Sequence, residues 1–299
     1  MAEVQFKRTE LEDRELLHSY FRRYPSRSCE RTFANALLWS RHYPVTFAII
    51  ENTLVFRSLD EEGESYSFPA GEEEDIKKAI QFLKIYTEER GLPLILYHVT
   101  HAQFEQLEAW YPGRFEIEFN RDIADYIYES QSLATLAGKK LHAKRNHINK
   151  FKATHENWSY ESMSTENVEE CFQMALKWRN DNGCEENVEK NAEMCVTLNS
   201  LRLFEELELK GGVLRSDGKV IAFTIGEEIC EDTFVVHIEK AFADIQGAYP
   251  MINQQFVEHE CMGYRYINRE EDTGEEGLRK AKLSYRPVFI EEKGIVKEK

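Results

Sequence analysis

The chain has 299 residues, of which 42% are hydrophobic, 12% aromatic and 31% charged. This length is comfortable for two domains, and the composition supports buried cores, which excludes a disordered chain. The formal net charge is −16, and a uniformly acidic surface repels nucleic acid. A dedicated DNA-binding protein is therefore not expected, although a local basic groove remains compatible with this charge.

The sequence carries no signal for a membrane or for secretion. No apolar run approaches the roughly 20 residues that span a bilayer, and Met1–Thr9 lacks the apolar segment of a signal peptide. The six cysteines are dispersed and form no CxxC pair, which is typical of reduced thiols and unlike a zinc site. We therefore expect a cytoplasmic protein with no integral membrane segment and no bound metal.

The first part of the chain alternates between helix and strand patterns. Thr9 followed by Glu12 forms a capping-box pattern and predicts a helix that ends before Pro25. Further elements are a hairpin of Val45–Ile50 and Thr53–Phe56, a strand over Tyr66–Phe68, a helix over Glu72–Arg90, a strand over Leu94–Val99, a helix from Thr100 and Gln103 to Trp110, and a strand over Arg114–Asn120. This order predicts an α/β layer domain over residues 1–130.

A basic bridging helix is predicted over residues 131–155, with its helical pattern in Leu133–Phe151. Within it, Lys139–Lys152 holds six basic residues and no acidic one. One interpretation is a solvated helix face; the other is contact with a phosphate-rich ligand, either a nucleotide tail or the acceptor arm of a tRNA. The candidate polyanion contacts are Lys139, Lys140, Lys144, Arg145 and Lys150.

Residues 156–299 repeat the α/β order and predict a second domain, which carries the expected active site. The predicted elements are helices over Asn167–Trp178 and Asn191–Leu209, a hairpin of Gly212–Arg215 and Lys219–Glu228 around Asp217-Gly218, a strand over Thr233–Ile238, a helix over Met251–Met262, a strand over Tyr264–Asn268, a helix over Gly277–Tyr285 and a strand over Val288–Glu291. The fold class is therefore α/β in two tandem layered domains.

The stretch Thr233–Tyr285 contains the strongest candidates for chemistry. The turn Asp244–Ala248 precedes a helix that begins near Tyr249-Pro250, and free N–H groups before a helix can bind an anion; a plain strand-to-helix turn is the alternative. The cluster Asn268–Asp272 follows a strand, where a carboxylate could accept a proton from an amine; a solvated acidic loop is the alternative.

Two single residues in this stretch also leave alternatives open. Tyr285 ends a helix and could protonate a leaving group, or it could serve packing alone. His237 lies within an apolar strand, with Val236 and Ile238 expected on the opposite face. A histidine satisfied within the strand is favoured there over a catalytic one.

Four segments together resemble a known family: HIEKAFADIQGAYPMINQQF, YRYINREEDTG, GLRKAKLSYRP and the earlier DYIYESQSLATLAGKKLHAKRNHINKF. They are similar to the C-terminal-domain family of the phosphatidylglycerol lysyltransferases, over about Phe68 to Glu292. Many members of that family are uncharacterised soluble bacterial proteins. The family is similar to tandem GCN5-related N-acyltransferase (GNAT) folds and to the Fem-type aminoacyl transferases. The resemblance thus implies two tandem acyl-CoA N-acyltransferase-like domains.

The resemblance implies acyl or aminoacyl transfer to an amine or hydroxyl, and it places the donor on the second domain. The implied donor-binding residues are Val235, Val236, His237, Ile238, Gln246, Gly247, Ala248, Tyr249 and Asn268. Asp244 stands where the superfamily's pyrophosphate loop has Gln or Arg, and Tyr249 where it has a small residue. The implied catalytic residues are Tyr285 as general acid and a carboxylate among Glu239, Glu270 and Asp272 as base.

These inferences lead to an enzyme hypothesis with alternatives. The leading one is a cytoplasmic acyl- or aminoacyltransferase that uses a small coenzyme A-type donor, either CoA or acyl-CoA, and an amine or hydroxyl acceptor; no lipid acceptor is expected. One alternative uses aminoacyl-tRNA as the donor, with the basic segment holding its phosphates. The other is a catalytically silent binding module. The first domain is expected to be structural or to line the cleft.

Overall fold

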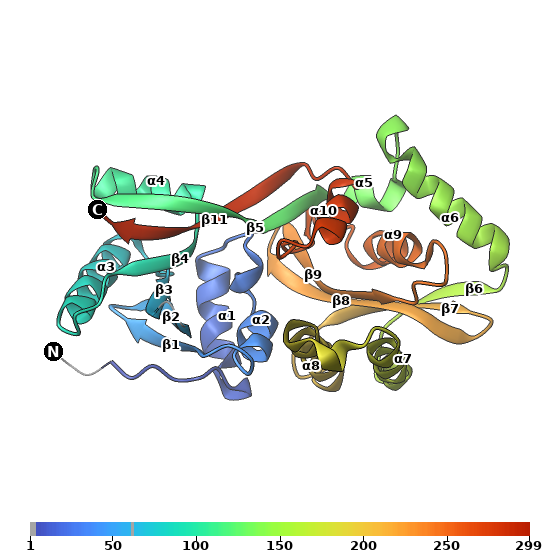
Figure 1. The fold of residues 1–299 in the computed structure, drawn as a ribbon, viewed down its shortest axis with the longest axis horizontal. Helices are drawn as coiled ribbons and strands as arrows, with labels where there is room; N and C mark the ends of the chain where they lie inside the picture. The colour runs from blue at the N-terminus through green and yellow to red at the C-terminus, as the bar shows by residue number, and fades with distance from the viewer. Residues whose placement is uncertain (1–3, 61–62) are drawn as a thin grey trace. The chain divides into compact units, whose positions relative to one another are not determined.

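The computed structural model describes residues 4–60 and 63–299, and the chain forms two compact units (Figure 1). The first unit comprises Met1–Asp125, Glu271–Glu275 and Ile290–Lys299, and the second comprises Tyr126–Glu270 and Glu276–Phe289. Each unit combines a mixed sheet with helices. The predicted α/β class is therefore confirmed.

The first unit builds its sheet in the strand order β1-β2-β3-β4-β11-β5. Strands β1 to β3 are antiparallel, β3 runs parallel to β4, and β11 is antiparallel to β4. Its elements are η1 Leu11–Asp13, α1 Arg14–Arg23, η2 Cys29–Arg31, α2 Phe33–Trp39, β1 Val45–Ile50, β2 Thr53–Asp60, β3 Gly63–Ser67, α3 Glu73–Glu88, β4 Ile95–Thr100, α4 His101–Trp110, the first part of β5 Phe115–Glu129, and most of β11 Phe289–Glu298.

The second unit has the order β5-β10-β9-β8-β7-β6, in which only β9 and β10 pair in parallel. Helix α9 lies on one face of β8 and β9, and α7 and α8 lie on the other (Figure 1). Its elements are α5 Ser130–Thr135, η3 Lys139–Leu141, α6 His142–Thr154, β6 Trp158–Ser162, α7 Val168–Asp181, η4 Cys184–Glu186, α8 Val188–Arg202, β7 Lys210–Ser216, β8 Lys219–Cys230, β9 Thr233–Ala241, α9 Ala248–Glu260, β10 Tyr266–Asn268 and α10 Glu276–Leu283.

The two units repeat one topology. In each, antiparallel strands lead into a strand–helix–strand crossover whose two strands pair in parallel: β3–α3–β4 in the first unit and β9–α9–β10 in the second. A further helix follows each crossover, α4 and α10 respectively. This repetition of element order is the tandem arrangement that the sequence predicts.

Alternating side chains of the hairpin strands cover both faces of the first sheet. Val55 of β2 joins the core formed with α3, whereas the ring of its neighbour Phe56 stacks on Phe21 of α1. The hairpin turn at Glu51 and Asn52 has positive φ at both residues, which matches the twist of the strands that it joins. The predicted hairpin is therefore confirmed.

The predicted division of the chain differs from the observed units in two ways. Residues 131–155 form no separate bridge, because α5, η3 and α6 belong to the second unit. The last strand, β11, pairs with β4 and belongs mostly to the first unit rather than to the domain predicted over 156–299. The sheet to which a terminal strand belongs depends on hydrogen bonds to strands that are distant in the sequence. Local sequence patterns do not encode these pairings.

Several predicted elements need correction. The single helix over Leu133–Phe151 is wrong, because Leu136 and Gly138 adopt positive φ and end α5 before α6 begins. The first capping box is formed by Glu10 and Asp13, not by Thr9 and Glu12. Strand β6 was not predicted, and β5 is longer than expected.

Candidate functional site

A β-bulge in β9 directs the side chains of the second unit's site. The pairing of β9 with β8 shifts register between Ile225 and Gly226, so that His237 is the extra residue. A bulge interrupts strict alternation and re-aims the side chains that follow it. Glu239 consequently contacts α9, whereas Lys240 contacts α7 and α8 on the other face. The simple alternation expected around His237 is therefore interrupted.

The strand pairing of β9 ends early on its β10 side. The parallel register runs from the pair Tyr266 and Thr233 to the pair Asn268 and Val235, where β10 ends. Strand β9 continues to Ala241, paired in this part only with β8 among the described strands. The polar side chains that follow β10 therefore collect beside the free edge of β9.

Glu239 forms the centre of a buried polar cluster. Its Oε1 accepts a hydrogen bond from Arg269 Nη2 at 3.0 Å, and its Oε2 accepts one from Asn253 Nδ2 at 3.0 Å. Arg269 directly follows β10, and Asn253 lies on α9. Within the described residues, two further polar atoms of these side chains, Arg269 Nη1 and Asn253 Oδ1, are buried without a hydrogen-bond partner, while the Arg269 side chain also interacts with the Tyr285 phenol. Such orphaned atoms are costly unless a ligand or water satisfies them.

Tyr285 packs on this cluster from the end of α10. The Arg269 guanidinium lies 4.8 Å and Lys144 Nζ 3.9 Å from the centre of its ring. Burial raises the pKa of the Tyr285 phenol, and the positive charge of Arg269 opposes that rise only in part. Tyr285 therefore keeps its proton near neutral pH and can donate it.

His237 is held between two carboxylates. Its Nδ1 lies 2.7 Å from Glu270 Oε1, and its Nε2 lies 2.9 Å from Glu227 Oε1. Burial alone lowers the pKa of His237, but the hydrogen bonds to Glu227 and Glu270 outweigh it and raise this pKa to about 10. The imidazolium thus neutralises two acids, which agrees with a satisfied strand histidine.

Two hydrogen bonds from side chains to the main chain hold the turn that carries Arg269. Asn268 Oδ1 accepts the Glu270 N–H at 2.6 Å, and Lys282 Nζ donates to the Arg269 carbonyl at 2.6 Å. Glu270 has a φ of 56°, a conformation that needs such support outside glycine. Asn268 and Glu270 therefore position Arg269 through the main chain.

The predicted anion loop packs closely against α6 at Gly247. Gly247 has a φ of 89°, and a Cβ there would lie 2.5 Å from the His147 carbonyl oxygen and 2.9 Å from Phe151 Cβ. Its lack of a side chain thus lets α6 approach. The amide of Ala248 already donates to Ile245, that of Met251 donates to Gly247, and Pro250 has none. The amides of Ala248 and Met251 are therefore already engaged within the protein.

The remaining predicted donor residues are mostly buried structural groups. Val235, Val236 and Ile238 belong to the core, and Val235 lies between β8 and β10. Tyr249 is near Trp178 and the Ala241 backbone, while Gln246 lies in the turn before α9. Asp272 belongs to the first unit, where its Oδ1 accepts the Gly274 N–H at 3.0 Å.

The five predicted polyanion contacts have three different surroundings. Lys139, Lys140 and Lys150 are exposed. Arg145 instead donates to the carbonyls of Leu136 and Gly138, so it stabilises the break between α5 and α6. Lys144 is half-buried against Tyr285. The phosphate contacts stay a prediction, and Lys139, Lys140 and Lys150 are the exposed residues among the five.

Sequence reasoning missed Arg269 and Asn253. Arg269 lies between Asn268 and Glu270, in the segment predicted to supply a carboxylate base. A basic residue within this acidic segment was a signal that it could bind one of the carboxylates. Asn253 gives no signal, because an amide within an apolar helix pattern resembles an exposed position until α9 is docked.

The first unit also has a buried charged cluster, and the sequence did not predict it. Lys293 Nζ lies 2.9 Å from Asp125 Oδ1, 2.7 Å from Glu30 Oε1 and 3.8 Å from Cys29 Sγ. Cys29, Asp125 and Glu271 bring ligand atoms within 4.8 Å of one another, as a metal site would. The Lys293 ammonium already supplies the positive charge there, so these residues fit an internal ion pair better than a metal.

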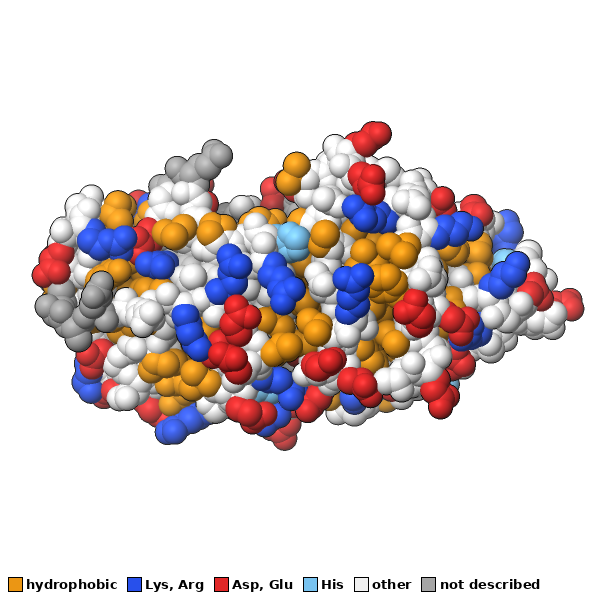
Figure 2. All heavy atoms as spheres, turned by 90° about the horizontal axis from the view of Figure 1, so that it is seen from below, with side chains coloured by type: hydrophobic (Ala, Val, Ile, Leu, Met, Phe, Trp, Pro, Cys, Tyr) orange, Lys and Arg blue, Asp and Glu red, His pale blue; other side chains and the backbone are white. Residues whose placement is uncertain are grey.

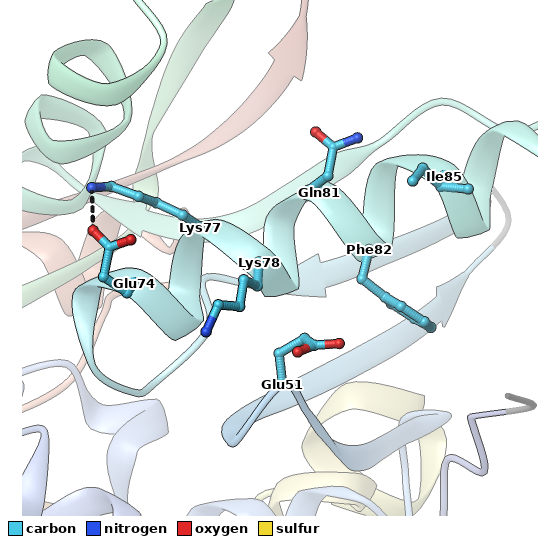
Figure 3. Close-up of a pocket in the computed structure, with 7 residues that line it drawn as sticks. All are labelled: Glu51, Glu74, Lys77, Lys78, Gln81, Phe82 and Ile85. Carbon is cyan, nitrogen blue, oxygen red and sulfur yellow. Dashed lines mark hydrogen bonds and ion pairs between the residues drawn. The ribbon is translucent and has the colours of Figure 1, made fainter. Parts of the chain in front are cut away.

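A surface depression on α3 offers no comparable chemistry (Figure 3). Lys77 pairs with Glu73 and Glu74, and Lys78 pairs with Asp75, all within the same helix. The other lining residues shown are Glu51, Gln81, Phe82 and Ile85. Acidic, basic and apolar side chains are likewise interspersed on the face shown in Figure 2. Neither surface gathers groups of complementary catalytic function.

The fold is that of solved C-terminal domains of lysylphosphatidylglycerol synthetases. A structure so described from Agrobacterium fabrum matches with a TM-score of 0.67 at 15% identity, covering 96% of this chain and 92% of that one. The structure of L-PGS from Bacillus licheniformis matches with 0.65 at 15% identity, covering 95% and 91%. The chain belongs to the corresponding family, phosphatidylglycerol lysyltransferase, C-terminal, whose model matches residues 21–296.

Two further relatives carry no assigned function. A conserved protein of unknown function from Bacteroides thetaiotaomicron is 39% identical, with a TM-score of 0.93 over 99% of this chain and all of that one. An uncharacterised protein of Mycoplasmoides gallisepticum is 25% identical over 193 residues, which span 63% of this chain and 61% of that protein. Within residues 4–60 and 63–299, no helix has both the length and the apolar character that a membrane span requires.

Proposed function

We propose that the protein is a cytoplasmic aminoacyltransferase that moves an aminoacyl group from an aminoacyl-tRNA ester to an amine or hydroxyl acceptor. One observation carries the proposal: among the residues that the structure describes, Arg269 Nη1 and Asn253 Oδ1 are buried without a hydrogen-bond partner, and both side chains bind Glu239. One atom is a donor and the other an acceptor. An aminoacyl group offers the complementary pair, a carbonyl oxygen and an α-ammonium.

These groups suit the steps of ester aminolysis. Arg269 Nη1 donates to the carbonyl oxygen and stabilises the negative charge that develops there. Asn253 Oδ1 accepts from the α-ammonium and orients the aminoacyl group. The acceptor's lone pair attacks the carbonyl carbon, the ester C–O bond breaks, and Tyr285 gives its proton to the leaving ribose oxygen.

The same observation favours an aminoacyl group over an acetyl group. An acetyl group has no amine, so it would leave Asn253 Oδ1 buried and unpaired. The packing of α6 on Gly247 also weighs against a pyrophosphate in the turn before α9. Coenzyme A or acyl-CoA as donor stays a prediction from the sequence, and it is the second candidate in the test below.

The exposed lysines of η3 and α6 suit the phosphates of a tRNA donor. Lys139, Lys140 and Lys150 are exposed and belong to the same unit as the cluster around Glu239. Each phosphate contact would release counterions and make binding sensitive to salt. We expect Lys150→Gln to reduce this salt dependence without changing the preference for an aminoacyl group.

Calorimetry with two small donor analogues tests the proposal. The analogues are 3′-aminoacylamino-3′-deoxyadenosine and its 3′-acetylamino counterpart, which lacks the α-amine. We expect the aminoacyl analogue to bind about tenfold more tightly, as one satisfied buried polar group implies. Asn253→Leu should abolish this preference, while Asn182→Leu, at an exposed amide after α7, should keep it.

Each outcome separates the candidate functions. Equal binding of the two analogues by the unchanged protein contradicts the role of Asn253. Binding of acetyl-CoA without either analogue favours the CoA-type donor. Binding of the aminoacyl analogue without transfer from bulk aminoacyl-tRNA to any supplied amine or hydroxyl favours the silent binding module. Unfolding midpoints of both variants identify any loss that reflects misfolding.

A further inference from the structure

We propose that Lys144 is the catalytic base of this site, which accepts the proton of the attacking amine or hydroxyl. The inference rests on the proposed aminoacyl transfer and assigns the residue that the reaction still requires. The sequence placed Lys144 among the phosphate contacts, but the structure separates it from them.

Position distinguishes Lys144 from the other lysines of its segment. Its Nζ lies 3.9 Å from the centre of the Tyr285 ring, and its side chain is half-buried. Lys140 and Lys150, before and after it in the chain, are exposed. Tyr285 also contacts Arg269, and the charge of Arg269 acts on Lys144, so the amine belongs to the surroundings of the proposed acid.

Two features of the surroundings shift Lys144 toward its neutral form, while the face of the Tyr285 ring favours the ammonium. Burial and then the positive charge of Arg269 lower the pKa of Lys144 to about 8, and Glu239 opposes them only in part. Arg269, Glu239 and Tyr285 are the titratable groups that face it. In the described part of the chain, Lys144 forms no ion pair with a carboxylate. A desolvated lysine beside another cation is a known way to obtain a reactive amine.

The other candidate bases are already engaged. Both oxygens of Glu239 accept hydrogen bonds, from Arg269 and Asn253. Glu270 is bonded to the His237 imidazolium. Tyr285 is protonated and suits the role of acid rather than base. Lys144 is the group next to Tyr285 that can accept a proton in this pH range.

The proton balance of the reaction closes with this pair. The acceptor attacks the carbonyl carbon and gives its proton to the lone pair of Lys144 Nζ. The ester bond breaks, and the leaving ribose oxygen takes the proton of Tyr285. The Lys144 ammonium then returns one proton to the Tyr285 phenolate, which restores both residues. The products are the aminoacylated acceptor and the free ribose hydroxyl.

Competitive labelling of lysines with acetic anhydride tests the reactive amine without any substrate. The rate of acetylation of each lysine is followed by mass spectrometry between pH 6 and 11, and its midpoint reports the pKa of that amine. We expect a midpoint near 8 for Lys144. Lys78 of α3 serves as control, because its hydrogen bond to Asp75 raises its pKa, and it should show a higher midpoint than Lys144. A midpoint for Lys144 equal to that of Lys78 overturns the proposal.

Kinetics then separate this role from the proposed function. In transfer from bulk aminoacyl-tRNA, Lys144→Gln should lower kcat about 100-fold or more and remove the rise of kcat through pH 8, with a small change in KM. Lys219→Gln, at an exposed position of the same unit to which no role in binding is assigned, should keep the pH profile. Transfer with an unchanged profile in Lys144→Gln overturns the role of Lys144 alone. No transfer by the unmodified protein overturns the proposed function itself.

Discussion

Each of the two units contains a lysine whose side chain is shielded from water. The surroundings of the two lysines shift the pKa of the amine in opposite directions. Lys293 in the first unit is fully buried between Asp125 and Glu30. Burial lowers its pKa, but Asp125 and then Cys29 and Glu30 outweigh this and raise the pKa well above its usual value. Lys144 in the second unit is half-buried against Tyr285, and burial and then the positive charge of Arg269 lower its pKa to about 8.

This contrast distinguishes a lysine that stabilises the fold from a lysine that we propose takes part in the reaction. Lys293 pairs with two of the acids around it. In the described part of the chain, the cluster near Lys144 retains a buried donor and a buried acceptor that form no hydrogen bond. Two units of the same topology can therefore differ in function. In one unit the buried charges bind one another, whereas in the other some buried polar atoms are left to bind a ligand. The three predictions that follow test this difference, from the largest expected effect to the smallest.

The largest effect is expected in the first unit. Lys293→Met leaves Asp125 and Glu30 buried without their counter-ion, and breaking a buried pair in this way costs about 3–5 kcal/mol. Urea titration measures the loss in the free energy of unfolding. Lys297→Met, at an exposed position of the same strand, should change it by less than about 0.5 kcal/mol. A loss below about 1 kcal/mol in Lys293→Met would show that the cluster is not structural.

An intermediate effect is expected from pH at His237. Its folded pKa is raised to about 10, above the ordinary value of 6.5, so its stabilisation is fully present below pH 6.5 and is lost as the pH rises toward 10. Between pH 7 and 9 the free energy of unfolding should fall by about 2–3 kcal/mol more in the unmodified protein than in His237→Gln. Denaturant titrations at the two pH values measure this. Parallel pH dependence in both proteins would contradict an imidazolium between Glu227 and Glu270.

A smaller effect is expected where α6 approaches the turn before α9. Gly247→Ala introduces a Cβ against His147 and Phe151 at a positive φ, which should cost about 2 kcal/mol of unfolding free energy. Hydrogen exchange should show reduced protection of α6, the helix that carries Lys144. Gly263→Ala is the control, because a Cβ there meets nothing within 4 Å. Unchanged protection of α6 would mean that Gly247 does not determine its docking.

Local patterns predicted most of the elements because each pattern is a local physical property. The Thr100–Gln103 capping box and the Asp217-Gly218 turn are both present, since capping and positive φ depend on neighbours in the chain. The break at Leu136–Gly138 was missed because it depends on Arg145, which donates to its carbonyls only once α6 has folded back.

By itself, the sequence determined the mixed α/β class, the tandem element order and the family, and it singled out Glu239 and Tyr285 as site residues. Tertiary structure alone decided that Arg269 and Asn253 flank Glu239 and that Lys144 lies on Tyr285 instead of facing solvent with Lys150. The physical reason is that hydrogen bonds and pKa shifts depend on distance in space. The bulge at His237 and the docking of α9 set those distances, and no spacing along the chain encodes either.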